Sequence, residues 1–312
     1  MNNRLRVVAV LALVCAAVFG ARLIAANTAA PASDVVTMTV TAVGKKDTAP
    51  PAIKQEDVQL TLGKEKKQLA GWTKAEKLYL AVLVDDALDS SAAAQWSDVK
   101  EFLSGQPDST YEMVAYARNA TAMVAQDFTN DHALAAKALR IPMGNVGAFG
   151  SAYLSLLDLM KRWQGSGDRR SILLISSGID YFRGGGYGMK SPDLDSVIAR
   201  AQKGNINIWS IYYPGMGHRS QSLFRATSGQ WNLSELADET GAESYYLGTS
   251  APVSFKPYLD EIQTHLSNQY LLAFAAGAGG GKKGKFERAR VSTELENVEF
   301  LHANQVFLPA AP

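Results

Sequence analysis

The stretch Lys77–Ser91, which reads KLYLAVLVDDALDSS, constrains the fold more than any other part of the sequence. Its first half, Leu78–Val84, is a short, continuous apolar run, which is the pattern of a strand buried on both faces of a parallel sheet. The run ends abruptly in acidic residues and serines, beginning with Asp85 and Asp86. In open α/β folds, ligands bind where the carboxyl ends of the strands meet solvent. We therefore expect this edge of the sheet to be the binding face.

Two further apolar runs repeat this pattern later in the chain, at Arg170–Ser176 and Ile206–Tyr212. A hairpin-like pair of strands, Tyr111–Ala117 and Ala120–Phe128, turns at Arg118–Asn119. Helices are predicted at Ala92–Leu103, Asn130–Arg140, Ser151–Trp163, Ser191–Gly204, Asn232–Thr240 and Phe255–Ser267, and a last strand at Glu243–Leu247. Strands that alternate with helices predict an α/β fold, namely a doubly wound, mostly parallel sheet with one antiparallel strand.

Segments that contain only predicted strands flank this α/β region on both sides. They are Asp34–Val43, Asp57–Leu62 and Gln68–Trp72 before it, and Gln269–Ala275, Lys285–Thr293, Asn297–Leu301 and Gln305–Leu308 after it. These strands need a core of their own, and the simplest solution pairs them into one small β-sandwich. The predicted organisation is a signal peptide (1–26), a linker (27–33), a first part of the sandwich (34–72), the α/β domain (76–268) and a second part of the sandwich (269–312).

The N-terminal segment is typical of an export signal. Two arginines precede the apolar run Val7–Ala21, which is too short for a comfortable membrane span. We expect an exported protein, periplasmic or extracellular, with cleavage after Ala26 or a few residues later. The alternative is an uncleaved N-terminal anchor, which would be the chain's only contact with a membrane. Cys15, the only cysteine, lies within the signal, so the mature chain would contain no disulfide.

The charge composition points away from nucleic acid. The chain has 31 Lys and Arg against 30 Asp and Glu, so its net charge of +1 creates no field that attracts nucleic acid or lipid. The four histidines are scattered without zinc-ligand spacing, and there is no Gly-x-Ser-x-Gly elbow. We therefore predict a protein partner and no enzymatic activity. The enzyme alternative is a serine hydrolase built from Ser177, Asp180 and His218.

The order of the predicted elements, with one antiparallel strand near the start, resembles the von Willebrand factor type A domain. The segments that carry the resemblance are LAVLVDDALDSS, GAFGSAYLSLLDLMKRW, RRSILLISSGID and NQYLLAFAAGAGGGKKGKFERARVST. More narrowly, the chain resembles the VWFA-related secreted proteins of bacteria from Asp34 to its end. The resemblance implies a protein–protein interaction (adhesion or assembly) module that holds Mg²⁺ with an Asp-x-Ser-x-Ser loop, a Thr and a further Asp. Mg²⁺ prefers such oxygen ligands and leaves a position for a partner's carboxylate.

The first loop of this family motif is only partly matched. Asp85 corresponds to the first Asp, Ala87 replaces the first Ser and has no ligand atom, and Asp89 takes the position of the second Ser. A register that starts at Asp86 would restore Ser90 but would place a leucine where a ligand belongs. The alternative is that Asp85 and Asp86 cap the neighbouring helix or accept hydrogen bonds from loop amides.

The other two parts of the motif are also altered. Ser151 replaces the Thr, Ser177 replaces the Asp that follows a later strand, and Asp180 comes three residues after it as a substitute. The predicted degenerate Mg²⁺ site therefore consists of Asp85, Asp89, Ser151 and Asp180.

Two long loops, Gly178–Lys190 and Pro214–Trp231, follow parallel strands and therefore reach the same edge of the sheet as Asp85. They carry aromatic residues and arginines, which dominate the hot spots of protein interfaces. The predicted partner-binding residues are Phe182, Arg183, Tyr187, Arg219, Phe224 and Arg225. In one alternative, these loops fold over the degenerate site and bury their aromatic residues. In another, the protein is a structural component of an envelope or secretion assembly that acts through edge strands of its β-sandwich.

Overall fold

The structure is a computed structural model that describes residues 35–45, 48–74, 76–144, 150–163, 169–181, 190–216 and 222–310. The predicted signal peptide and linker lie outside the described residues. The chain divides into two units, Met1–Val35 and Val36–Pro312, and the description below concerns the second. Among the described residues, no helix is both long enough and apolar enough to span a membrane.

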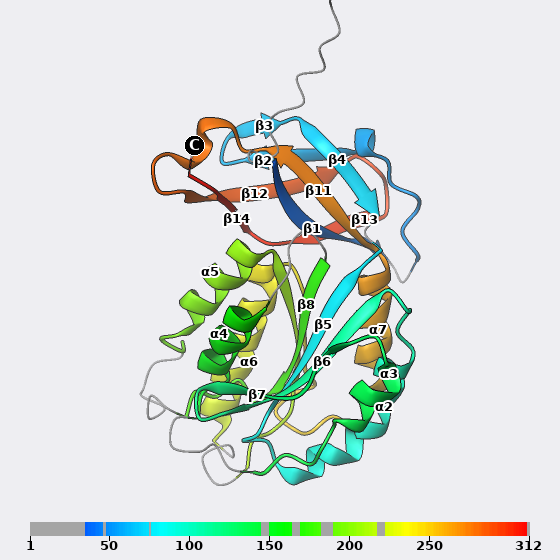
Figure 1. The fold of residues 1–312 in the computed structure, drawn as a ribbon, viewed down its shortest axis with the longest axis vertical. Coiled ribbons are helices and arrows are strands. Elements are labelled where there is room, and N and C mark those ends of the chain that lie inside the picture. Colours follow the sequence, from blue (N-terminus) through cyan, green and yellow to red (C-terminus); the bar gives the residue numbers. More distant parts are fainter. Residues whose placement is uncertain are drawn as a thin grey trace, which may run out of the picture. The chain divides into compact units, whose positions relative to one another are not determined.

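A six-stranded sheet is the centre of the α/β part, and its strands follow the order β10-β9-β8-β5-β6-β7 (Figure 1). The strands are β5 (Leu78–Asp85), β6 (Thr110–Arg118), β7 (Thr121–Thr129), β8 (Arg169–Ser176), β9 (Ile206–Tyr212) and β10 (Ser244–Tyr245). Neighbouring strands are parallel except β6 and β7, which are antiparallel. The order runs outward in opposite directions from β5 and β8, so the carboxyl ends of these two strands form the topological switch point at which doubly wound folds bind ligands.

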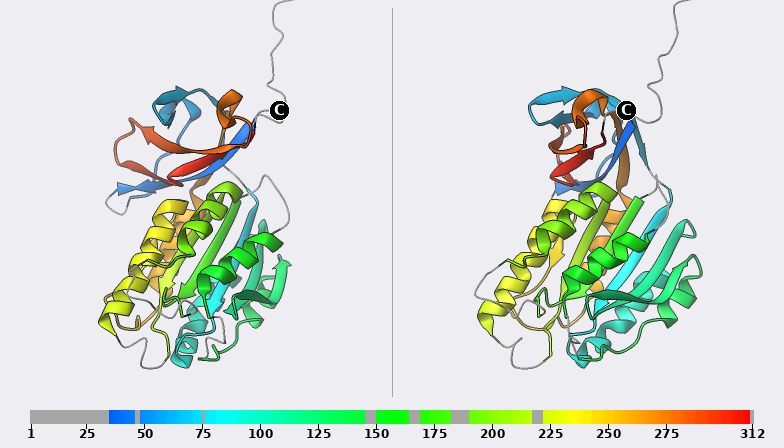
Figure 2. Two further views of the ribbon diagram at one scale, coloured as in Figure 1. Left: turned by 90° about the vertical axis from the view of Figure 1, so that its left-hand side faces the viewer. Right: turned by 60° about the vertical axis from the view of Figure 1, so that its left-hand side comes forward.

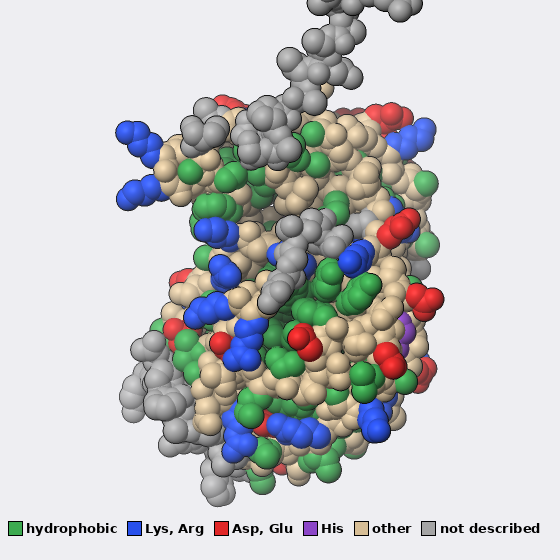
Figure 3. Space-filling view, viewed as in Figure 1, with side chains coloured by type: hydrophobic (Ala, Val, Ile, Leu, Met, Phe, Trp, Pro, Cys, Tyr) green, Lys and Arg blue, Asp and Glu red, His purple; other side chains and the backbone are tan. Residues whose placement is uncertain are grey.

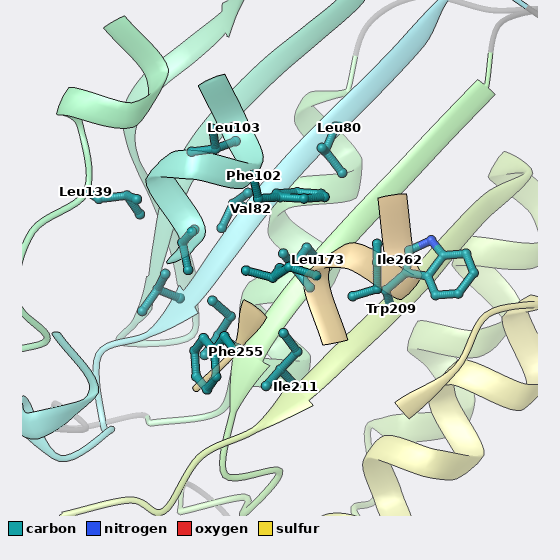
Figure 4. Packing of buried hydrophobic residues seen from close by; sticks show 14 of the residues in the cluster. Leu80, Val82, Phe102, Leu103, Leu139, Leu173, Trp209, Ile211, Phe255 and Ile262 are labelled. Atoms are coloured by element: carbon teal, nitrogen blue, oxygen red, sulfur yellow. The ribbon is translucent and has the colours of Figure 1, made fainter. Parts of the chain in front are cut away.

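Helices cover both faces of the sheet (Figure 2). They are α2 (Trp96–Ser104), α3 (His132–Lys137), α4 (Ala152–Arg162), α5 (Leu194–Gly204), α6 (Leu223–Thr240) and α7 (Lys256–Ser267). Leu80 of β5 packs in one core with Phe102 of α2 and Ile262 of α7 (Figure 4). Leu83 of the same strand points into the opposite core with Leu156 of α4. Because successive side chains of a strand alternate between the two faces, burial on both sides requires the continuous apolar run seen in the sequence.

The strands at the two ends of the described chain form two four-stranded sheets, in the orders β13-β1-β11-β4 and β14-β12-β2-β3. Their bounds are β1 (Val35–Gly44), β2 (Val58–Leu62), β3 (Glu65–Lys67), β4 (Leu69–Lys74), β11 (Gln269–Ala275), β12 (Lys285–Thr293), β13 (Val298–His302) and β14 (Gln305–Leu308). Early and late strands pair directly, β1 with β13 and β2 with β12. Val40 and Phe274 from one sheet share a core with Leu60 and Val291 from the other.

The predicted loop Pro214–Trp231 is wrong over its second half, because α6 begins at Leu223 and is continuous with the predicted helix at residues 232–240. The first half of α6 lacks an apolar stripe and contains Gly229, a poor helix former, so the sequence pattern concealed it. Gly229 is required by packing, since a Cβ atom at this position would lie 2.1 Å from the carbonyl oxygen of Ser177.

Two elements are shorter than predicted. The helix expected at Asn130–Arg140 is confined to α3, and the residue before Pro142 is disfavoured in a helix. The backbone N–H of Arg140 instead donates to the hydroxyl of Tyr116. The strand expected at Glu243–Leu247 pairs only over the two residues of β10.

Candidate functional site

Asp85 ends β5 at the switch point and is buried there. Its Oδ2 accepts a hydrogen bond from the hydroxyl of Ser176, at the end of β8, over 2.7 Å, and its Oδ1 accepts one from the amide of Ala87 over 2.9 Å. Burial raises the pKa of Asp85 to about 6, although both hydrogen bonds oppose the shift. The carboxylate is therefore held by groups of its own chain, and its serine partner is Ser176, the residue before Ser177.

Asp86 forms a buried ion pair that the sequence did not reveal. The guanidinium of Arg140 donates to both carboxylate oxygens of Asp86 over 2.7 and 2.8 Å, and the amide of Met143 donates to one of them over 3.2 Å. The same guanidinium lies 3.7 Å from the ring centroid of Tyr116. This bidentate geometry fixes the segment after α3 against the end of β5. Asp86 thus has a structural role. The alternative motif register that starts at Asp86 would therefore have a first acid that is already paired with Arg140.

Asp89 caps the short 3-10 helix Ser90–Gln95 (η4). Its Oδ1 accepts hydrogen bonds from the amide of Ser91 over 2.9 Å and from the hydroxyl of Ser91 over 2.6 Å. These bonds lower the pKa of Asp89. Of the three acids in this loop, Asp89 therefore performs the capping that the sequence allowed for Asp85 or Asp86, while Asp85 accepts the loop amide.

Ser151 and Asp180 are both buried and are bound to groups close to them in the chain. The hydroxyl of Ser151 caps α4 by accepting from the amide of Leu154 over 3.3 Å. Asp180 accepts from the hydroxyl of Ser191 over 2.8 Å. Burial, and after it the charges of Asp180 and Asp85, raise the pKa of Tyr153, which lies in the first turn of α4. Asp85 and Asp180 thus lie near Tyr153, and Asp85, Asp89, Ser151 and Asp180 each have a hydrogen-bond partner within the chain.

Tyr181 places its hydroxyl at the switch point. A Cβ atom on Gly215 would lie 2.4 Å from the Tyr181 oxygen and 3.4 Å from the hydroxyl oxygen of Ser177. Burial and the nearby charge of Asp85 raise the pKa of Tyr181 to about 12, against the opposing effects of Ser177 and Arg225. Tyr181 comes from the first predicted edge loop. Its position matches the expectation that loop aromatics fold over the site, although it was not among the predicted site residues.

The three acids of the predicted Mg²⁺ site are not gathered into one cluster. In the part of the chain that the structure describes, Asp85, Asp89 and Asp180 do not bring three carboxylate ligand atoms within 4.8 Å of one another. Ala87 contributes a methyl group where the family motif has a hydroxyl. Mg²⁺ usually takes one or two protein carboxylates and keeps several waters, so the predicted site stays a prediction.

An apolar rim surrounds the switch point. Its residues are exposed and come from three segments, which follow α3, β9 and β10: Ile141, Met143, Met216, Leu223, Phe224, Leu247 and Val253. The exposed fraction reaches 74% for Leu247 and 97% for Val253. On the face drawn in Figure 3, hydrophobic and basic side chains lie next to one another near the lower end of the α/β part, where β5 ends in Figure 1.

The predicted partner-binding residues fall into two groups. Phe224 is 53% exposed in the first turn of α6. Arg225 beside it is half-buried, and its charge lowers the pKa of Tyr181, which partly offsets the effect of burial. The other four, Phe182, Arg183, Tyr187 and Arg219, lie outside the described residues. The methionines and leucines of the apolar rim were not predicted, because single apolar residues in loops carry no periodic signal.

Comparison with known proteins gives matches of fold only. No family model matches the chain, and no curated protein matches it. An aerotolerance-related membrane protein from Bacteroides fragilis is 10% identical, with a TM-score of 0.43 over 61% of this chain and 98% of that chain. A von Willebrand factor type A protein from Catenulispora acidiphila is 10% identical, with a TM-score of 0.41 over 89% of this chain and 73% of that chain.

A manganese-loaded TRAP protein from Plasmodium vivax is 10% identical, with a TM-score of 0.40 over 78% of this chain and 98% of that chain. Identities this low say nothing about ligands or partners. The six-stranded sheet of the described chain has the strand order, with a single antiparallel strand next to β6, that the sequence resemblance led us to expect.

Proposed function

We propose that this chain is a protein–protein interaction module that binds its partner through the apolar rim, without a metal ion at the switch point. The observation that carries the proposal is the set of exposed apolar side chains that three separate segments contribute to one edge of the sheet. Contiguous exposed apolar surface of this kind marks interaction sites. In this proposal, the partner is bound by burying methionine, leucine and phenylalanine side chains, and no metal ion is shared between the two proteins.

Site-specific photo-crosslinking tests this proposal. A photoreactive phenylalanine analogue is placed at Phe224 or at Leu247, and the control carries it at Leu134, which is 44% exposed on α3. We expect one protein to be cross-linked from both rim positions and not from Leu134, with equal yield in EDTA. Equal cross-linking from all three positions, or loss of the product in EDTA, would refute rim binding without metal.

We also propose that the protein is not an enzyme. The hydroxyl of Ser177 is fully buried and accepts a hydrogen bond from the amide of Ile179 over 3.4 Å. Asp180 is bound to Ser191, and His218 lies outside the described residues. A fluorophosphonate probe should therefore leave Ser177 unlabelled, and labelling that depends on Ser177 would restore the hydrolase alternative.

Finally, we propose that the protein is exported, with the α/β domain inserted between the two parts of the β-sandwich. The N-terminal signal supports export, and the direct pairing of β2 with β12 supports the insertion. A phosphatase fused after residue 312 should be active only if the chain crosses the membrane. An inactive fusion that remains in the cytoplasm would exclude export.

A further inference from the structure

A second cluster of metal-ligating side chains lies far from the switch point. Glu243 directly precedes β10, while Glu261 and His265 lie one helical turn apart on α7. Each residue has a ligand atom within 4.8 Å of those of the other two. β10 is three strands away from β5, which corresponds to about 14 Å across the sheet. The cluster is therefore separate from the acids of the predicted Mg²⁺ site.

The imidazole of His265 provides an independent indication of a ligand. His265 is only 5% exposed, and its Nδ1 is buried without a hydrogen-bond partner. This nitrogen is directed at Oε2 of Glu243, 3.7 Å away, which is too long for a hydrogen bond. The ring lies beside the indole of Trp209, with their centroids 5.3 Å apart. A buried polar atom that bonds to nothing is unfavourable, and it requires a ligand or another explanation.

The geometry points to a zinc site formed by Glu243, Glu261 and His265. One imidazole nitrogen and two carboxylates are a common donor set for Zn²⁺, which binds them at about 2.0–2.2 Å. Two ligands on one tetrahedral ion at such distances are about 3.4 Å apart. The separation of 3.7 Å between Nδ1 of His265 and Oε2 of Glu243 is close to that value.

The surroundings suit an ion with three protein ligands and one position open to water. The hydroxyl of Tyr245 donates to Oε2 of Glu243 over 3.0 Å and thereby orients the carboxylate. Glu261 is exposed, so the ion reaches the cluster from solvent and a water completes the tetrahedron. The bound ion joins the edge strand β10 to the last turns of α7, the helix that leads directly into β11.

Zn²⁺ alone, added to the metal-stripped and tag-free full chain, tests the site. Competition with a chromophoric chelator should give one tight equivalent, and Glu261→Gln should weaken it at least tenfold. The matched control is Asp260→Asn, the neighbouring exposed acid of α7, which should leave the affinity unchanged. Glu261 is exposed, so its replacement leaves the fold intact, and circular dichroism of both variants verifies this.

A second measurement reads the coordination itself. Co²⁺ bound in place of Zn²⁺ should show the intense visible absorption of a tetrahedral ion, and Glu261→Gln should reduce it. The absence of a tight equivalent, or equal binding by wild type and Glu261→Gln, would overturn the assignment. The zinc titration needs no partner, and cross-linking from Phe224 on α6 involves neither β10 nor α7, so failure of the zinc site and failure of the proposed function are distinguishable.

Discussion

The ion pair between Asp86 and Arg140 should be the most sensitive polar contact at the carboxyl edge. Replacing Arg140 by Met removes both hydrogen bonds to Asp86 and the stacking on Tyr116, and it leaves a fully buried carboxylate without its cation. Breaking a buried pair from one side costs about 3–5 kcal/mol. The side chain of Arg140 is 39% exposed, so solvent screens part of the interaction and we expect about 3 kcal/mol.

Urea and thermal unfolding, followed by circular dichroism, measure this loss. For a chain of 312 residues, about 3 kcal/mol corresponds to a fall in Tm of about 5 °C. The matched control is Arg162→Met, because Arg162 pairs with Asp158 over the same 2.7 Å but at the surface, where such pairs contribute less than about 1 kcal/mol.

A double variant separates the unpaired charge from lost packing. Adding Asp86→Asn to Arg140→Met should recover more than half of the lost stability, since no buried charge then remains. If Arg140→Met unfolds within about 0.5 kcal/mol of Arg162→Met, the reasoning from burial is wrong.

Two further predictions concern the same edge. Burial raises the pKa of Asp85 from 3.8 to about 6, so the folded chain retains a proton that the unfolded chain loses. Stability should therefore fall by about 3 kcal/mol as the pH rises through this window, and Asp85→Asn should flatten that part of the unfolding profile. Gly229→Ala should lower the Tm despite better helix propensity, since its Cβ would contact the Ser177 carbonyl, whereas exposed Thr227→Ala should not.

The strands of the six-stranded sheet could be predicted because burial on both faces leaves an unambiguous apolar run. The hairpin between β6 and β7 was also visible, and Asn119 and Ala120 both adopt positive φ there. The helical first half of α6 could not be predicted, since its buried face consists of Ala226, Gly229 and Gln230 and not of large apolar residues. Here the contact with the loop after β8, rather than a periodic pattern, selects the helix.

The site was predictable in its location but not in its contacts. At a strand end, adjacent residues point to opposite faces, so whether Ser176 or Ser177 meets Asp85 depends on the register between β5 and β8. That register pairs Val84 with Ile175, which places Ser176 beside Asp85. The partner of Asp86 is 54 residues away in the chain, in a segment without a periodic pattern.

The contacts of Asp85, Asp86 and Asp89 together determine how this edge of the sheet can bind a partner. In a metal-centred site, unsatisfied acids are held by the ion, and the ion in turn attracts the partner's carboxylate. Here Asp85 is held by Ser176, Asp86 is neutralised by Arg140, and Asp89 caps a helix. Little charge is left for a partner on Asp85, Asp86 and Asp89 themselves, and large apolar side chains are exposed around them. Binding at this edge should therefore depend weakly on ionic strength, whereas capture through basic residues alone would weaken steeply with added salt.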